Sequence, residues 1–111
     1  MKQLTAIVKT TCVDVIVKSL GDIGAREMTI SEIKGVGEQV QLYRPYTIHT
    51  KIDIIIPDER ADEVSNVILK HAHTGFAGDG IIAVYPVDYI IKIRTKERQN
   101  GPDEHIDKNG E

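Results

Sequence analysis

Hydrophobic residues along the first third of the 111-residue chain recur with two different periods. Residues 3–9 alternate loosely and predict a buried strand, and residues 27–33 alternate again and predict a second one. Between them, residues 12–20 follow the helical period of three to four. The apolar side chains expected on one face of this helix are Val13, Ile16, Val17 and Leu20. The pattern therefore predicts a strand, a helix and a strand.

The same order of elements recurs later in the chain. Residues 46–56 contain isoleucines on one parity, which predicts a third strand. A second helix is expected to begin near Pro57 and to run to about Ala72, because acidic residues suit the first turn of a helix. Two short strands are predicted at residues 81–87 and 89–95.

Two consecutive strand–helix–strand units predict a ferredoxin-like βαββαβ fold of the α+β class. Its antiparallel sheet would carry both helices on one face. The run Ile54–Ile56 places apolar side chains on both faces of its strand, so we expect the second face to be buried by self-association in a closed homo-oligomer. The expected domain spans residues 1–95, and the polar residues 96–111 would form a C-terminal loop or tail.

Charge and composition narrow the range of partners and compartments. Fourteen basic and seventeen acidic residues give a net charge of −3, which argues against nucleic acid as a partner. The single cysteine, Cys12, cannot form an internal disulfide and favours a reducing compartment. No apolar run approaches the roughly 20 residues of a membrane span, and the N-terminus does not resemble an export signal. We therefore expect a cytoplasmic protein without membrane insertion.

Three short segments contain the candidate chemistry: Gly35–Gln39, Thr74–Gly80 and Lys92–Thr95. Glycines at such spacing let backbone N–H groups turn inward to bind an anion, and Lys92 and Arg94 would neutralise phosphate charge. Each segment alone is more often an ordinary turn or a solvated strand end, by about two to one. Their combination with the repeated strand–helix–strand unit favours phosphate binding.

Other polar clusters give weaker indications. His71 and His73 at the end of the second helix do not share a helical face, so a helix C-terminal cap is favoured over a metal site. Neither Asp53 nor Asp88 has a base and a nucleophile at the spacing of a catalytic triad. The sequence therefore predicts neither a metal site nor an enzyme.

Over residues 1–95 the sequence resembles the P-II signalling proteins, which are trimeric sensors of adenylate charge and of nitrogen or carbon status. The most specific of the shared motifs is Thr-Gly-x-x-Gly-Asp-Gly. The segments that carry the resemblance are Met28–Thr29, Glu32–Gln39, Leu42–Arg44, Lys51–Asp58, Thr74–Gly80 and Ile93–Thr95. The resemblance implies a homotrimer with an adenine nucleotide in each cleft between neighbouring subunits.

The resemblance also implies roles for individual residues. Thr29 would help hold the base, and Gly78–Gly80 would form the phosphate loop. Gln39 matches a position that joins a site for magnesium and 2-oxoglutarate. The residues expected to bind the nucleotide are Thr29, Gly35, Val36, Gly37, Gln39, Gly78, Asp79, Gly80, Lys92 and Arg94. Those expected in an exposed switch loop are Glu38, Tyr43, Arg44 and Tyr46.

Three departures from the family pattern change the expected ligand. Glu38 stands where the family usually has arginine, Ile81 stands where it usually has lysine, and Lys92 replaces the first of two strand arginines. Because phosphate-facing cations are lost, we expect ADP or AMP to bind more tightly than ATP, for which magnesium would be needed.

The tail suggests a branch of the family. Residues 100–105 resemble the Cys-Gly-Pro-x-Gly-Cys terminal loop of carbon-linked P-II-like proteins, with Asn100 and His105 in place of the cysteines. This predicts control of a transporter or enzyme in inorganic carbon metabolism, with bicarbonate as a possible second ligand. The alternatives are a nitrogen-regulatory P-II protein that senses ATP and 2-oxoglutarate, a small ferredoxin-like enzyme that uses the same cleft, and a structural trimer that binds no nucleotide.

Overall fold

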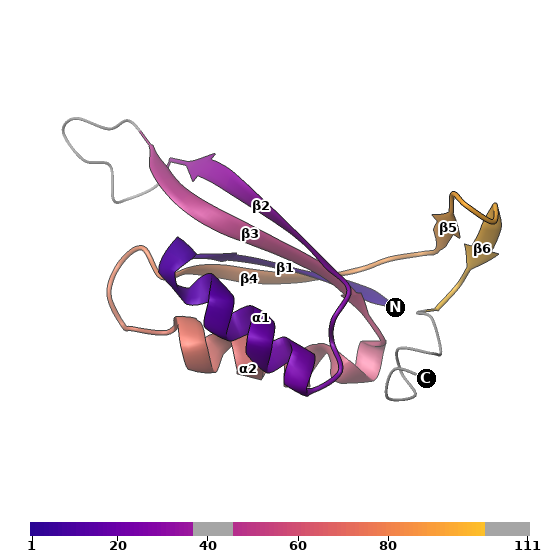
Figure 1. Cartoon of the computed structure of the whole chain (residues 1–111), viewed down its shortest axis with the longest axis horizontal. Helices are drawn as coiled ribbons and strands as arrows, with labels where there is room; N and C mark the ends of the chain where they lie inside the picture. The colour runs from indigo at the N-terminus through magenta and orange to yellow at the C-terminus, as the bar shows by residue number, and fades with distance from the viewer. Residues whose placement is uncertain (37–45, 102–111) are drawn as a thin grey trace.

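The computed structural model describes residues 1–36 and 46–101. Two α-helices and a four-stranded sheet form the main body, and a short two-stranded sheet follows it (Figure 1). A single 3-10 turn precedes each helix. The elements are β1 (Lys2–Val8), α1 (Val13–Asp22), β2 (Met28–Gly35), β3 (Thr47–Ile56), α2 (Ala61–Ala72), β4 (Gly80–Pro86), β5 (Ile90–Lys92) and β6 (Glu97–Gln99).

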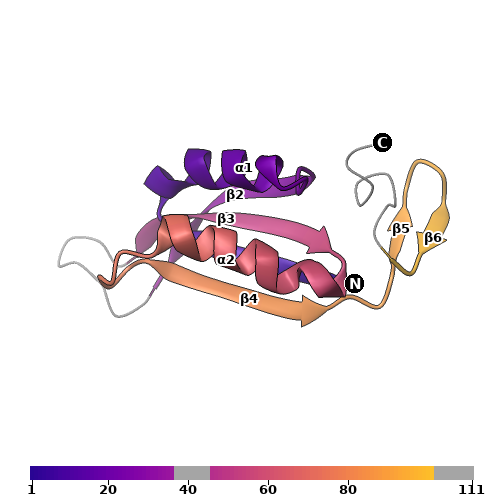
Figure 2. The same ribbon diagram turned by 90° about the horizontal axis from the view of Figure 1, so that it is seen from below.

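The main sheet has the strand order β2-β3-β1-β4, and every neighbouring pair is antiparallel. Both helices lie against one face of this sheet, and no helix of the described residues covers the other face, called the open face below (Figures 1 and 2). The two strand–helix–strand units interleave, because β1 lies between β3 and β4. This arrangement confirms the predicted ferredoxin-like α+β fold.

The hydrophobic core lies between the sheet and the two helices. In β3 the side chains alternate between the two faces, so Ile52, Ile54 and Ile56 are buried while Ile55 is 37% exposed. The sheet residues meet apolar side chains of both helices. The largest fully buried side chains of this core are Leu4, Val8, Ile16, Leu20, Ile52, Val64 and Ile68. Each contributes about 1.5–3 kcal/mol relative to an exposed position.

The open face of the sheet mixes apolar and polar side chains. Ile55 lies on it, and so does a hydrogen-bonded chain in which Thr5 Oγ1 donates to Asp53 Oδ1 at 2.6 Å. The Thr5 hydroxyl also lies 3.0 Å from the hydroxyl of Tyr85. The face therefore has the apolar component that the sequence predicted, and its burial by self-association stays a prediction.

The segment after β4 differs from the prediction. The sequence predicted one strand over residues 89–95, but β5 ends at Lys92 and the chain turns back through residues 93–96 to β6. Lys96 adopts a positive φ of 63°, and its N–H donates to the Lys92 carbonyl at 2.7 Å. The Arg98 guanidinium lies 4.0 Å from the centre of the Tyr89 ring, which ties the two strands together. Residues 97–99, predicted to belong to the tail, thus form a strand of a hairpin.

In the part of the chain that the structure describes, neither helix has the length and apolar content to cross a bilayer.

Candidate functional site

The loop between α2 and β4 depends on its glycines. Gly75, Gly78 and Gly80 all have positive φ, a conformation that side chains other than glycine rarely adopt. At Gly80 an added Cβ would lie 1.7 Å from the carbonyl oxygen of Ile7, because β1 and β4 approach closely there. Glycine is therefore required for both the turn and the strand pairing.

Asp79 binds several donors of this same loop. Its Oδ2 accepts the backbone N–H of Thr74 at 2.8 Å and that of Gly75 at 2.9 Å, and its Oδ1 accepts the Thr74 hydroxyl. Lys9 at the end of β1 adds an ion pair, with Nζ 3.2 Å from Oδ1. The Thr74 hydroxyl, these backbone donors and Lys9 hold the pKa of the Asp79 carboxyl well below its usual range.

The end of β2 lies at the same end of the sheet as this loop. Gly35 pairs with Thr47 at the start of β3, and His49 of β3 lies 2.9 Å from the carbonyl oxygen of Gly78 through its Nε2. Val36 follows Gly35 and is 80% exposed. The structure thus brings Gly35 and Val36, the described part of the first predicted segment, to the same end of the sheet as Thr74–Gly80. Backbone N–H groups flanked by glycines can form an anion site there.

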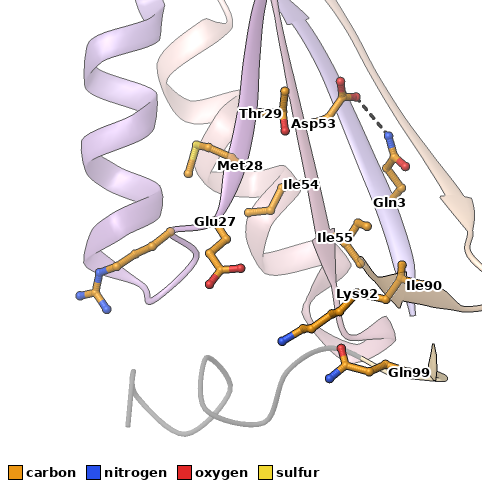
Figure 3. A pocket seen from close by; sticks show the side chains of 11 residues that line it. Gln3, Glu27, Met28, Thr29, Asp53, Ile54, Ile55, Ile90, Lys92 and Gln99 are labelled. Atoms are coloured by element: carbon orange, nitrogen blue, oxygen red, sulfur yellow. Dashed lines mark hydrogen bonds between the residues drawn. The ribbon is translucent and has the colours of Figure 1, made fainter. Parts of the chain in front are cut away.

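A pocket of about 690 Å³ lies near the opposite end of the sheet (Figure 3). Thr29 of β2 and Lys92 of β5 both line it, so two of the predicted ligand residues share one cavity. Thr29 pairs in register with Asp53 of β3, whose carboxylate also accepts a hydrogen bond from the Gln3 side chain at 3.2 Å. The residues that line the pocket are Gln3, Arg26, Glu27, Met28, Thr29, Asp53, Ile54, Ile55, Ile90, Lys92 and Gln99.

The two groups of predicted residues lie far apart within one chain. Thr29 and Gly35 are six residues apart along β2, which corresponds to about 20 Å in an extended strand. Arg94 belongs to neither group, because it lies exposed in the turn between β5 and β6. The predicted strand over residues 89–95 would have held both Lys92 and Arg94, whereas the observed strand β5 ends at Lys92.

Several predicted residues lie outside the described part of the chain. They are Gly37, Glu38, Gln39, Tyr43 and Arg44. Tyr46 is described and lies just before β3, with Lys34 Nζ 4.7 Å from the centre of its ring. This contact joins the two strands at the base of the hairpin.

Sequence reasoning missed residues that the strand register brings into these sites. Asp53 was considered only as a catalytic acid, whereas it lies in the pocket beside Thr29. Lys9, directly after β1, and His49 of β3 anchor the glycine loop. Their polar identity at strand positions was a signal, but only the pairing of the strands shows what each of them contacts.

The histidines near the end of α2 do not form a metal cluster with other residues of the described ranges, 1–36 and 46–101. His71 Nε2 instead lies 3.0 Å from the Ser19 hydroxyl of α1 and links the two helices.

These observations define a ferredoxin-like α+β domain with a glycine-rich loop folded around Asp79 and a separate pocket lined by apolar and polar side chains. Comparison with known proteins gives the family. Residues 1–97 match the family model for nitrogen regulatory protein P-II, so the chain belongs to the P-II family.

Similar proteins span nearly the whole chain. Nitrogen regulatory protein P-II of Haemophilus influenzae is 39% identical over 106 residues, which cover 87% of this chain and 95% of that protein. The protein of the same name from Pasteurella multocida is 38% identical over the same shares. Nitrogen regulatory protein P-II 1 of Escherichia coli K12 is 36% identical over 109 residues, or 90% of this chain and 97% of that protein.

Membership of the family fixes the general kind of activity. P-II proteins are non-catalytic regulatory signalling proteins that bind adenine nucleotides and target proteins, and they form trimers. The chain is therefore a regulator and not an enzyme. The names of the relatives refer to nitrogen and give no support to the carbon-linked branch expected from the tail.

Proposed function

We propose that the chain is a homotrimeric regulator that binds an adenine nucleotide between subunits. Thr29 and Lys92 lie at one end of the sheet, and Gly35 with Gly78–Gly80 lies at the other. One small ligand cannot reach both ends of one chain, because about 20 Å separates them along β2. A cleft between two copies can join the pocket of one subunit to the glycine loop of the next. This separation is the observation that carries the proposal.

The residues present suit such a ligand. A pocket of about 690 Å³ is within the usual range of small-molecule sites and mixes apolar walls with a few polar groups. Thr29 offers a hydroxyl for the base, and Lys92 offers a cation for a phosphate. The glycine loop adds backbone donors that are not covered by side chains at Gly78 and Gly80.

The charge near the glycine loop favours ADP or AMP over ATP. Ile81, which follows Gly80, is 62% exposed and supplies no cation. The nearby Lys9 is already paired with Asp79. A third phosphate adds negative charge that needs a cation or magnesium. The γ-phosphate of ATP should therefore add little affinity at this loop.

Between the two branches of the family, the relatives support a role in nitrogen regulation. All three proteins compared above carry nitrogen regulatory names, whereas the carbon-linked likeness rests on a short tail segment, most of which lies outside the described residues. Binding of 2-oxoglutarate together with magnesium and ATP would indicate the nitrogen-regulatory branch, and binding of bicarbonate would indicate the carbon-linked branch.

Calorimetric titration tests this function. AMP, ADP and ATP are titrated into the purified protein with and without magnesium, and then with 2-oxoglutarate or bicarbonate added. We expect saturable binding of one nucleotide per subunit without turnover. ADP or AMP should bind more tightly than ATP. If none of the three nucleotides bound, the alternative of a structural trimer without a nucleotide site would be favoured. Steady nucleotide hydrolysis would instead favour a small ferredoxin-like enzyme.

A further inference from the structure

The glycine loop before β4 contains its own anion. Two backbone N–H groups of the loop, those of Thr74 and Gly75, point at Asp79 Oδ2 from 2.8 and 2.9 Å. The Thr74 hydroxyl donates to the other carboxylate oxygen. The same hydroxyl oxygen accepts the backbone N–H of Phe76 at 3.2 Å. The first part of the loop is thus folded around a carboxylate of the same chain.

Asp79 also fixes the loop to the sheet. Lys9 Nζ, at the end of β1, lies 3.2 Å from Asp79 Oδ1. The next residue, Gly80, begins β4 and pairs with Val8 of β1. The side chain of Asp79, which lies between the two glycines predicted to face the phosphates, therefore connects the start of the loop to the end of β1.

We propose that Asp79 is a positioning residue, whose carboxylate shapes the Gly78–Gly80 turn without itself contacting the nucleotide. The inference rests on the proposed nucleotide binding at this loop, and it replaces the direct binding role that the sequence predicted for Asp79. Its carboxylate oxygens already have partners, and a carboxylate repels a phosphate unless a cation lies between them. The N–H groups of Thr74 and Gly75 are likewise occupied, so the ligand would bind at the other end of the loop.

Two substitutions separate a positioning role from a charge role. In Asp79→Asn, the amide oxygen can still accept the two backbone N–H groups, and the Thr74 hydroxyl can rotate to accept from the amide nitrogen. The variant keeps the hydrogen bonds of the loop and loses the negative charge and the pair with Lys9. Asp79→Ala removes all of these contacts. Asp88→Asn is the matched control, because Asp88 is exposed and its loss changes the net charge by the same amount.

The experiment measures two quantities for each variant. The first is hydrogen exchange of the Thr74 and Gly75 amides by NMR in the protein without ligand, and the second is ADP affinity by calorimetry. We expect Asp79→Ala to expose both amides to exchange and to weaken ADP binding by about tenfold or more, as for loss of one or two hydrogen bonds that shape a site. Asp79→Asn and Asp88→Asn should keep both the protection and the wild-type affinity.

The outcomes distinguish this inference from the proposed function. A loss of ADP affinity in Asp79→Asn as large as in Asp79→Ala would overturn the positioning role, because it would show that the charge itself is needed. Unchanged amide exchange in Asp79→Ala would overturn it as well. Failure of wild-type protein to bind any adenine nucleotide would refute the proposed function, while the exchange data would still show whether Asp79 holds the loop.

Discussion

His49 of β3 and Gly78 of the glycine loop are joined by a hydrogen bond of 2.9 Å between the imidazole Nε2 and the backbone carbonyl. A carbonyl oxygen only accepts, so Nε2 is the protonated ring nitrogen in this contact. The two residues are 29 positions apart in the sequence. The bond therefore connects the hairpin β2–β3 to the loop before β4, which are the two glycine-bearing segments at this end of the sheet.

Removal of this bond should loosen the loop. We expect His49→Ala to lower the free energy of unfolding by about 1 kcal/mol and to weaken ADP binding, because the Gly78 carbonyl loses a partly buried partner. His49→Gln retains a donor and should behave more like wild type. Urea denaturation and calorimetry check both effects, and His71→Ala, which alters a contact between the helices, serves as the control. Equal ADP affinity in His49→Ala and wild type would contradict this role.

Neighbouring isoleucines of β3 should respond differently to the same substitution. Ile54 is 3% exposed in the core, so Ile54→Asp should unfold the chain by burying an unpaired charge. Ile55 lies on the open face, so Ile55→Asp should leave a folded subunit that no longer assembles. Circular dichroism and light scattering measure folding and mass. A folded wild-type monomer at micromolar concentration would refute the trimer and the site between subunits.

A cation at position 81 should change the order of nucleotide affinities. The exposed Ile81 side chain has room to be replaced by lysine next to the glycine loop. We expect Ile81→Lys to raise ATP affinity by about tenfold and AMP affinity much less, since one charge-assisted hydrogen bond gives roughly 1.5–3 kcal/mol. Ile81→Met controls for the change in side-chain shape. An equal gain for all three nucleotides would show that the added charge does not act on the terminal phosphate.

Two glycines should give opposite results when replaced by alanine. Gly80→Ala should destabilise the protein by about 2 kcal/mol or more, because its Cβ would meet the Ile7 carbonyl and its φ is positive. Gly21 lies in α1 with open space around it, so Gly21→Ala should stabilise by about 0.5–1 kcal/mol. Thermal denaturation compares the two. A Gly80→Ala variant as stable as wild type would contradict the close approach of β1 and β4.

The glycine loop should stay intact down to a lower pH than it would if Asp79 had the ordinary pKa of an aspartate. The pKa of Asp79 is lowered by its hydrogen bonds, so its contribution to stability is fully present above the unfolded value of about 3.9. It is lost as the pH falls through the lower folded value. NMR titration of the Asp79 carboxyl carbon should therefore show a midpoint well below 3.9, and Thr74→Ala should move that midpoint upward. A midpoint near 3.9 in wild type would mean that these bonds do not form in solution.

The sequence by itself determined the order of the elements and most of their bounds. Periods of two and of 3.6 are local properties of strands and helices, so alternation in residues 46–56 and the stripe in residues 12–20 correctly predicted β3 and α1. The glycines of the loop before β4 were also predicted to act through their backbone. Their positive φ values and the close contact at Gly80 agree with that reading.

The hairpin β5–β6 could not be predicted from the pattern of hydrophobic and polar residues. Residues 97–99 are polar, so they show no alternation that would mark a strand. They pair because Lys96 takes a left-handed turn and because Arg98 packs on Tyr89. Turn direction at a lysine depends on such contacts and not on its own preference.

Only the tertiary structure decided which candidate residues meet. Antiparallel pairing places Thr29 beside Asp53 and Gly35 beside Thr47. Thr29 and Gly35 therefore lie toward opposite ends of the sheet. Strand register is set by contacts between residues distant in the chain, so no local pattern states it. The contacts of the Asp79 side chain were likewise not predicted, and its role as a nucleotide-binding residue stays a prediction. Its bonds to Thr74 and Gly75 are local to the loop, whereas its pair with Lys9 became visible only once β1 and β4 were side by side.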